Sequence, residues 1–293
     1  MLPAMPRIVS KSPRVWRHRS GEIVLDRTHV MGVLNVTPDS FSDGGRYLAP
    51  EAAIQRGLEI AEQGASILDV GGESTRPGSA SVSAEEEWRR IDPVLRGVVR
   101  KIDIPISIDT RKPDVADRAL ERGATIINDV TGLSDPRMAR LASKAHAGVV
   151  VMHMQGDPAT MQQAPRYTNV AEEVRDFLAA RAKAGMAAGI EREAIAVDPG
   201  IGFGKTVDQN LDLLRNLDGI VSLGHPVVVG VSRKSFIAHL GGGERMEDRL
   251  AGSLAAATLA AARGADLIRA HDVVETVRAM RVADGVLRCR ANL

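Results

Sequence analysis

Residues 63–69 read Gln63-Gly64-Ala65-Ser66-Ile67-Leu68-Asp69, and the same pattern returns twice further along the chain. The other copies are Arg122-Gly123-Ala124-Thr125-Ile126-Ile127-Asn128 and Arg263-Gly264-Ala265-Asp266-Leu267-Ile268-Arg269. Each copy has the form of a helix end, a glycine that caps the helix, and a strand that begins at once. The repeat therefore predicts a chain in which helices and strands alternate.

Eight short apolar runs extend this alternation over the chain, and each run ends in polar or charged residues. The runs are Val30–Val36, Ser66–Val70, Ile104–Ile108, Thr125–Ile127, Gly148–Met152, Ala194–Val197, Pro226–Val231 and Asp266–Ile268. The helices expected between and after them are Pro50–Gln63, Ala84–Lys101, Pro113–Arg122, Pro136–Ala145, Asn169–Ala188, Val207–Leu217, Met246–Arg263 and Asp272–Ala283. Eight strand–helix units predict the α/β class and a closed (β/α)₈ TIM barrel, whose active site lies at the carboxyl ends of the strands. The polar run ends should therefore meet on one rim.

The length of 293 residues suits one barrel of roughly 250 residues with a short extension. We expect one barrel domain over residues 28–293 and an N-terminal extension over residues 1–27. In this extension, Val15–Arg19 and Ile23–Leu25 have the pattern of two strands joined by a turn at Ser20–Gly21. Such a hairpin would cover the amino-terminal end of the barrel. Because the first twenty residues carry five Lys or Arg side chains and no acid, a transit peptide is the alternative for this segment.

The composition excludes several classes of protein. Apolar residues make up 44% of the chain and aromatic residues only 3%, so the core must consist mainly of Val, Ile, Leu and Ala. The net charge of +1 gives no general electrostatic basis for binding nucleic acid or a membrane surface. The single cysteine, Cys289, rules out an intrachain disulfide and fits a reducing, cytoplasmic location. No apolar run approaches the ~20 residues that span a bilayer.

Three long connections rich in Gly, Ser, Thr and Pro follow predicted strands and should lie on the catalytic rim. They are Thr37–Ala49, Gly71–Ser83 and Gln155–Thr168. The first follows Asn35, whose amide oxygen suits a hard cation such as Mg²⁺. The second begins with Gly71-Gly72, where the backbone can approach a ligand closely, and contains Arg76, whose guanidinium suits a phosphate or a planar ring. Surface turns with solvated side chains are the alternative for both.

Further motifs follow the last three predicted strands. Asp198-Pro199-Gly200-Ile201-Gly202-Phe203-Gly204-Lys205-Thr206 is superficially similar to an ATP-binding P-loop, but only three residues separate Gly200 from Gly204 where that loop needs four. We interpret it as a rim loop that leaves Asp198 facing inward. Ser232-Arg233-Lys234-Ser235 opens a helix, which suits either an anion or a plain helix cap. Arg269 and His271 are two residues apart and share a face at the usual phosphate position of a barrel.

Asp109, Asn128 and Asp198 end the third, fourth and sixth predicted strands and should point into one cup. A buried carboxylate needs a donor, and a heterocycle with an amino group beside a ring N–H offers two parallel donors. Ion pairs with Lys234 and the arginines are the alternative. His153 is interpreted as a structural residue, and no spacing of His and Cys indicates a zinc site.

Taken together, the motifs resemble those of the dihydropteroate synthases. The segments that carry the resemblance are Met31–Gly45, Asp69–Gly78, Ser107–Asp109, Asn128–Val130, Met152–Gln155, Asp198–Lys205, Gly230–Ile237 and Arg269–Val273. The resemblance implies a (β/α)₈ transferase of folate biosynthesis that joins 6-hydroxymethyl-7,8-dihydropterin pyrophosphate to p-aminobenzoate. It also implies Mg²⁺ as cofactor, a homodimer as the assembly and an enzyme of the kind that sulfonamides target, with susceptibility itself decided by small differences in the loops. Neither nucleic acid nor a membrane is implied as a partner.

The resemblance implies a role for each matching residue at the leaving group. Asn35, the metal residue, would contact the Mg²⁺-bound pyrophosphate. Arg269 and His271 would hold the phosphates, with Thr75 nearby. These groups would stabilise the negative charge that develops as the C–O bond breaks.

The pterin and the second substrate would occupy the rest of the cup. The resemblance implies that Asp109, Asn128 and Asp198 hold the pterin and that Lys234 bonds to its ring. The carboxylates would also favour a dissociative path, because positive charge develops on the pterin.

Around p-aminobenzoate, the resemblance implies Phe203, Arg76 and Ser235, with Ser235 near the carboxylate. Asp39 and Phe41 would belong to a mobile loop that closes over the reacting centre and excludes water. Asp39, Lys234, Asp109 and Asp198 are the residues expected to be catalytic.

Two other functions remain compatible with a pterin-binding cup. A methyltransferase barrel that holds reduced folate would not need Asn35, Arg269 and His271 for pyrophosphate. A non-catalytic paralogue should have lost loop residues such as Asp39 and Arg76, and this sequence retains them.

Overall fold

The computed structural model describes residues 14–37, 49–75, 78–242 and 245–287. Its main feature is an eight-stranded parallel sheet in the order β8-β7-β6-β5-β4-β3-β10-β9. The strands are β3 (His29–Asn35), β4 (Ile67–Gly71), β5 (Ile106–Asp109), β6 (Ile126–Asp129), β7 (Gly148–Met152), β8 (Ile195–Asp198), β9 (Val228–Gly230) and β10 (Leu267–Ala270). A parallel bridge between Val197 and Val227 joins β8 to the chain entering β9. This bridge closes the sheet, and the predicted (β/α)₈ barrel is confirmed.

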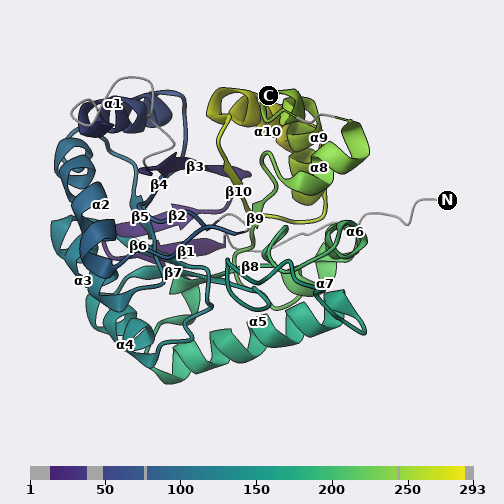
Figure 1. The fold of residues 1–293 in the computed structure, drawn as a ribbon, viewed down its shortest axis with the longest axis horizontal. Helices are drawn as coiled ribbons and strands as arrows, with labels where there is room; N and C mark the ends of the chain where they lie inside the picture. The colour runs from purple at the N-terminus through teal and green to yellow at the C-terminus, as the bar shows by residue number, and fades with distance from the viewer. Residues whose placement is uncertain (1–13, 38–48, 76–77, 243–244, 288–293) are drawn as a thin grey trace.

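Helices surround the sheet and connect its strands (Figure 1). They are α1 (Ala49–Glu62), α2 (Ala84–Val98), α3 (Pro113–Arg122), α4 (Pro136–Ala145), α5 (Val170–Ala187), α6 (Val207–Arg215), α7 (Leu217–Val221), α8 (Ser235–Gly241), α9 (Leu250–Ala262) and α10 (Val273–Leu287). Two 3₁₀ turns, η2 (Arg192–Ala194) and η3 (Glu247–Arg249), complete the described elements. The larger core cluster lies between the strands and this helical layer and is almost entirely aliphatic, as the composition predicted.

The glycines of the sequence repeat end helices as expected. Gly64, Gly123 and Gly264 have φ angles of +92°, +116° and +98°, a left-handed conformation that favours glycine. Each helix can therefore stop and turn directly into the next strand.

Two expected helices differ from those observed. The helix expected over Val207–Leu217 is divided into α6 and α7, because Asn216 leaves the helical conformation and its side-chain amide donates to the carbonyl of Asp212 at 2.9 Å. The helix expected from Met246 begins with the 3₁₀ turn η3 before α9.

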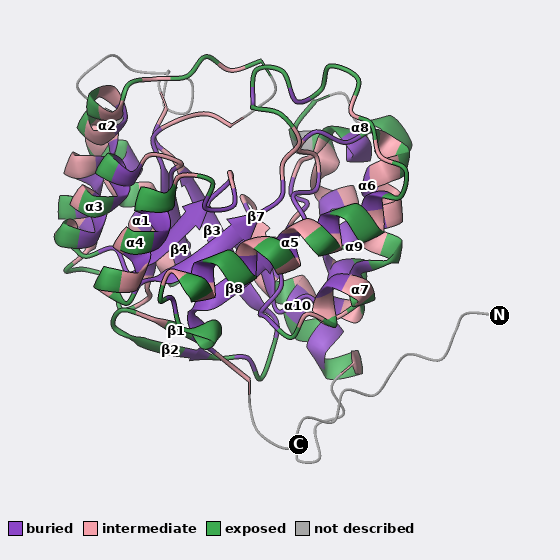
Figure 2. Ribbon diagram, turned by 90° about the horizontal axis from the view of Figure 1, so that it is seen from below, coloured by how far each residue is buried: buried purple, intermediate pink, exposed green. Residues whose placement is uncertain are grey.

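The predicted N-terminal hairpin is present as β1 (Val15–His18) and β2 (Gly21–Val24), an antiparallel pair. It lies at the end of the barrel opposite the long loops that follow the strands (Figure 2). Trp16 is fully buried, and its indole N–H donates to the carbonyl of Ala194 at 3.0 Å. The hairpin and the first inward residues of the barrel form one apolar cluster, the barrel floor: Trp16, Ile23, Leu25, Met31, Ile67, Ile126, Val150, Ala196, Val228 and Leu267.

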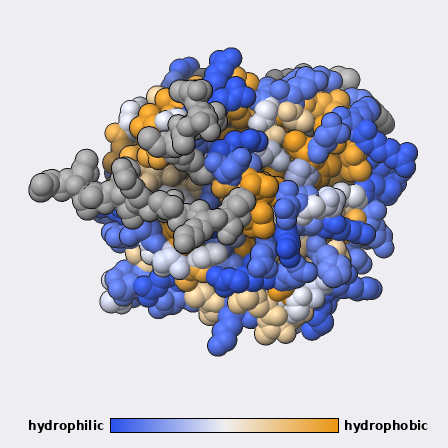
Figure 3. All heavy atoms as spheres, turned by 180° about the vertical axis from the view of Figure 1, so that it is seen from behind, coloured by the Kyte–Doolittle hydropathy of each residue, from blue (hydrophilic) through white to orange (hydrophobic). Residues whose placement is uncertain are grey.

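The outer surface mixes hydrophilic and apolar residues on the face seen in Figure 3. Within the described ranges, none of the helices combines the length and the apolar character that crossing a bilayer would need.

Candidate functional site

Inside the barrel, the side chains change from apolar to polar directly above the floor. Residues two apart on a strand point to the same side, so the residue two positions after each floor residue also faces the interior. Four strands show this change: Ile67 to Asp69 on β4, Ile126 to Asn128 on β6, Ala196 to Asp198 on β8, and Leu267 to Arg269 on β10. The result is a polar cup with an apolar floor, at the carboxyl ends of the strands.

Arg269 lies between two carboxylates of the cup. Its Nε donates to Oδ2 of Asp69 at 2.7 Å, and one terminal nitrogen donates to Oδ2 of Asp109 at 2.7 Å. The side-chain amide of Asn128 donates to the same Asp69 oxygen at 3.2 Å. Burial raises the pKa of Asp109 to about 7, although Arg269 acts in the opposite direction. The ion pair that we considered as an alternative for Asp109 is therefore formed in this structure, and it involves Arg269.

Asp198 occupies the opposite side of the cup and is 5% exposed. Burial raises its pKa to about 6, while the backbone N–H of Gly200, 2.7 Å from Oδ1, favours the ionised form. Gly200 has a φ of +66°, and a Cβ there would lie 1.9 Å from the carbonyl oxygen of His153. Only glycine fits this turn, which directs Asp198 inward.

The rim loop after β8 is held from below by a buried lysine. Lys205 Nζ donates to the carbonyl oxygens of Gly200 and Phe203, both at 2.9 Å, and lies 3.0 Å from Nδ1 of His153. Burial lowers the pKa of His153 to about 3, so its neutral ring accepts this hydrogen bond. Burial also lowers the pKa of Lys205, to about 7. His153 thus makes a structural contact, consistent with its interpretation from the sequence.

Lys234 projects into the cup from the loop between β9 and α8. Its Nζ lies 3.9 Å from the ring centroid of Phe203, a cation–π distance. Burial and then Arg269 lower the pKa of Lys234 to about 8, against the effects of Asp198 and Asp109. At neutral pH, the cup therefore contains two cations facing two carboxylates whose pKa values lie near neutrality.

His271 is oriented by Ser232. The Ser232 hydroxyl oxygen accepts from the backbone N–H of His271 at 3.2 Å and lies 3.1 Å from its Nδ1. Burial, followed by Arg269, lowers the pKa of His271 to about 3. A hydroxyl that accepts from the backbone can donate to Nδ1, which assigns the ring proton to Nε2.

Arg233 connects the last two rim loops. It is a non-glycine residue with a φ of +59°, a strained backbone conformation. Its guanidinium pairs with Asp272, and its backbone N–H donates to Oγ of Ser253 at 2.9 Å. These contacts fix the position of Arg233 between Ser232 and Lys234 in the chain.

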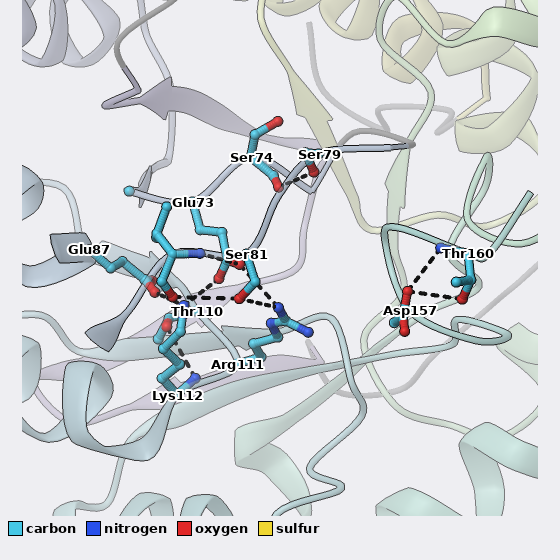
Figure 4. Close-up of polar contacts among 12 residues, drawn as sticks. Glu73, Ser74, Ser79, Ser81, Glu87, Thr110, Arg111, Lys112, Asp157 and Thr160 are labelled. Carbon is cyan, nitrogen blue, oxygen red and sulfur yellow. Dashed lines mark hydrogen bonds and ion pairs between the residues drawn. The ribbon is translucent and has the colours of Figure 1, made fainter. Parts of the chain in front are cut away.

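A second ionic cluster anchors the loop after β4 (Figure 4). Glu73 accepts from Arg111 at 3.1 Å and from Lys112, and Lys112 also donates to the fully buried Glu87 at 2.5 Å. Burial would raise the pKa of Glu73, but Lys112 and Arg111 outweigh it and the pKa is lowered. The segment that leads to Thr75 is thus fastened to the loop after β5.

The structure brings most of the expected site residues to one rim. Electrostatic contacts connect a central group of Asp109, Asp198, Lys234, Arg269 and His271.

Three other expected residues lie at the edge of this group. Asn35 is the last residue of β3 and pairs with Gly71 of β4, which in turn pairs with Asp109 of β5. Thr75 is half-buried after β4, and Ser235 is exposed at the start of α8. The expected residues Asp39, Phe41 and Arg76 lie outside the described residues.

The sequence analysis did not assign Asp69 or Lys205 to the site. For Asp69 a signal was present, because Asp69, Asn128 and Arg269 occupy the last position of the three copies of the repeat, and Asp69 contacts both others. Lys205 had no such signal, since its partners are backbone oxygens and one histidine.

Within the described ranges, no three His, Cys, Asp or Glu side chains are grouped so as to hold a metal ion. In the same part of the chain, the Asn35 side chain has no hydrogen-bond partner. A lone amide oxygen fits Mg²⁺ that reaches the site with a phosphate substrate, because Mg²⁺ keeps water and phosphate oxygens among its ligands.

Comparisons with known proteins agree with this geometry. Residues 31–271 match the family described as pterin binding enzyme. A dihydropteroate synthase of Escherichia coli (strain K12) is 46% identical over 268 residues, which cover 92% of this chain and 95% of the relative. A structure of Xanthomonas albilineans dihydropteroate synthase with 4-aminobenzoic acid has a TM-score of 0.89 at 45% identity, covering 94% of this chain and 99% of that chain. Another from the same organism, in complex with 7,8-dihydropteroate, has a TM-score of 0.84 at 45% identity, covering 91% and 96%.

Proposed function

This chain belongs to the dihydropteroate synthase family of pterin-binding enzymes, and we propose that its cup joins 6-hydroxymethyl-7,8-dihydropterin pyrophosphate to p-aminobenzoate. The protein is a transferase of folate biosynthesis. The observation that carries the assignment of the site is Arg269, held between Asp69 and Asp109 above an apolar floor. Carboxylates that suit a pterin beside a cation that suits its pyrophosphate support this proposal.

The pterin would lie across the cup with its amino and ring N–H groups directed at carboxylates. Asp109 and Asp198 are acceptors on opposite sides, and Asn128 adds an amide that can both donate and accept. Lys234 would donate to a ring oxygen or nitrogen, and its cation–π contact keeps it beside Phe203. Parallel charge-assisted hydrogen bonds of this kind give orientation as well as affinity.

The pyrophosphate would lie against Arg269 and His271. His271 can donate from Nε2 without carrying a charge, because Ser232 holds its Nδ1. Asn35, with Thr75 nearby, would contact the phosphate end, and Asn35 would supply one oxygen to Mg²⁺. When bound, Mg²⁺ would neutralise charge on the leaving pyrophosphate.

The p-aminobenzoate would enter over Phe203. The exposed Ser235 would contact its carboxylate, together with Arg76, which lies outside the described residues. Asp39 and Phe41 also lie outside them and would close over the reacting centre. Sulfonamides, as analogues of this substrate, would compete at the same position.

The reaction would follow a dissociative path. As the C–O bond to pyrophosphate breaks, Arg269 and His271 would stabilise the departing charge, and Asp109 and Asp198 would stabilise positive charge on the pterin. The aniline nitrogen is a free base at neutral pH and needs no general base to attack. Its proton can leave with pyrophosphate or solvent after the new C–N bond has formed.

The presence of Arg269 close enough to His271 to lower its pKa favours this function over a folate-dependent methyltransferase. A methyl transfer releases no pyrophosphate and would not need Arg269 and His271 side by side on the rim. The test is pyrophosphate release by the purified protein with pterin pyrophosphate, Mg²⁺ and p-aminobenzoate, each omitted in turn. Release that requires the amine and yields dihydropteroate supports the proposal, whereas pterin binding without this product supports a methyltransferase or a non-catalytic role.

We also propose that the protein is a cytoplasmic homodimer, with residues 28–293 as one barrel domain and residues 1–27 as its extension. The neighbouring helices α9 and α10 carry apolar side chains that are exposed in the monomer: Leu259 (64%), Val282 (69%) and Val286 (78%). Burial of such residues by a second copy is favourable. Val286→Glu should convert the dimer to a monomer in sedimentation velocity, and an unchanged mass would exclude this face.

A further inference from the structure

We propose that Asp69 is the fixed anchor of Arg269, holding its Nε throughout the reaction while the terminal nitrogen now on Asp109 turns to the pyrophosphate. Asp69 is thus a positioning residue for the transferase reaction. The inference rests on the roles proposed above for Arg269 and Asp109.

The two carboxylates that contact Arg269 differ in depth. Asp69 is fully buried, while Asp109 is 7% exposed. On the paired strands β4 and β5, Asp69 lies opposite Ser107, whereas Asp109 lies opposite Gly71, two residues nearer the rim. A pterin entering from the rim therefore meets Asp109 first, and Asp69 stays beneath it.

The contacts of Asp69 also indicate that it positions other side chains of the cup. Its Oδ2 receives both the Nε–H of Arg269 and the side-chain amide of Asn128. One buried carboxylate thus sets the positions of a phosphate-binding and a pterin-binding side chain, which come from β10 and β6. Fixing a guanidinium through Nε leaves its two terminal nitrogens free to change partners.

The arrangement predicts a transfer of one hydrogen bond when substrate binds. The pterin needs the oxygens of Asp109, so it competes with the terminal nitrogen of Arg269. Once Asp109 is engaged by the pterin, that nitrogen is available to the pyrophosphate of the same substrate. Without Asp69, once the pterin takes Asp109, Arg269 would keep neither of the two carboxylates that accept its hydrogen bonds among the described residues.

A double-mutant cycle tests whether Asp69 acts through Arg269. Asp69→Asn keeps the shape of the side chain and removes its charge, and should lower kcat/KM for pterin pyrophosphate about tenfold or more. In an Arg269→Gln background, the same change should cost less than about twofold, because the asparagine side chain keeps an oxygen that can accept from Asn128. Asp109→Asn is the matched control, since Asp109 also contacts the pterin itself and its loss should remain costly in that background.

An equal effect of Asp69→Asn in both backgrounds, or none in the native background, would overturn the inference. If Arg269→Gln were as active as the native protein, the proposed role of Arg269 would fail as well. If the native protein formed no dihydropteroate, the proposed function itself would fail.

A measurement on the unmutated protein does not depend on how the Asp69 variant folds. The Arg269 Nε–H signal, identified in nitrogen-15 spectra by its loss in Arg269→Lys, should stay protected from solvent exchange when dihydropteroate and Mg²⁺-pyrophosphate are added. Loss of that protection on binding would show that Asp69 releases Arg269, contrary to the inference.

Discussion

The strongest prediction concerns the pH dependence that Asp109 gives to the reaction. Burial raises the pKa of this carboxyl to about 7, so it becomes neutral as the pH falls through that value. Only the ionised form can accept two donors from a pterin and counter positive charge on it. The value of kcat/KM for pterin pyrophosphate should therefore fall on the acid side of pH 7.

The size of this fall follows from the ionised fraction. With a pKa of about 7, roughly 1% of Asp109 is ionised at pH 5, so kcat/KM should drop about a hundredfold between its plateau and pH 5. Asp198, with its pKa raised to about 6, should steepen the fall below that pH. In Asp109→Asn, the inflection near pH 7 should disappear, and the plateau should be lower by about 1.5–3 kcal/mol, or roughly 10–150-fold, for the lost charged hydrogen bonds.

The assay is initial pyrophosphate release from pH 5 to 9 at saturating p-aminobenzoate and constant free Mg²⁺. Titration of the substrate phosphates would affect all variants alike, so Asp176→Asn, at a carboxylate that is 69% exposed, serves as the control. An inflection near pH 7 that persists in Asp109→Asn would refute the reasoning, because the titrating group would then lie elsewhere.

Three further variants test other parts of the structure. Lys234→Ala should lower kcat about a hundredfold or more, and near-native turnover of this variant would contradict the role of Lys234. In the native protein, kcat/KM should also fall as the pH rises through about 8, because Lys234 loses its proton there. Lys205→Met removes the side-chain donor to the carbonyl oxygens of Gly200 and Phe203, of which that of Gly200 keeps the backbone N–H of Phe203. The loop that bears Phe203 should loosen, so the KM for p-aminobenzoate, measured at saturating pterin pyrophosphate, should rise. An unchanged KM would show that this loop needs no support from Lys205. Trp16→Ala opens a cavity in the barrel floor and removes the hydrogen bond to the carbonyl of Ala194. The free energy of unfolding, measured in urea, should therefore fall by about 3–5 kcal/mol. A fall below about 1 kcal/mol would mean that the hairpin contributes little to stability.

Much of the fold was predictable because its information is local. An apolar run and a polar strand end each occupy a few neighbouring residues and occur eight times, and a glycine helix cap precedes the strand in three of these units. The hairpin at Ser20–Gly21 and the strand ending in Asp198 were identified from such short patterns. The division between α6 and α7 was missed, because the Asn216 amide that breaks the helix competes with a pattern that otherwise continues.

The inward direction of the cup residues was also contained in the sequence. A two-residue period fixes which side chains share a face, so Asp109, Asn128 and Asp198 could be placed on one rim before any coordinates were known. The family resemblance added roles for them, but no contacts.

The tertiary structure alone decided which charges meet. Arg269 lies 200 positions from Asp69 and 160 from Asp109, and Lys205 lies 52 positions from His153. The local sequence does not determine which residues form such pairs. Any inward-facing cation could pair with any inward-facing carboxylate until closure of the barrel fixes the distances between them. The sequence by itself thus determined the barrel and the rim on which the chemistry takes place. The closed fold determined that Asp69, at the bottom of the cup, would hold Arg269, because it brings β4 and β10, which are distant in the chain, close enough for their buried charges to form a hydrogen bond.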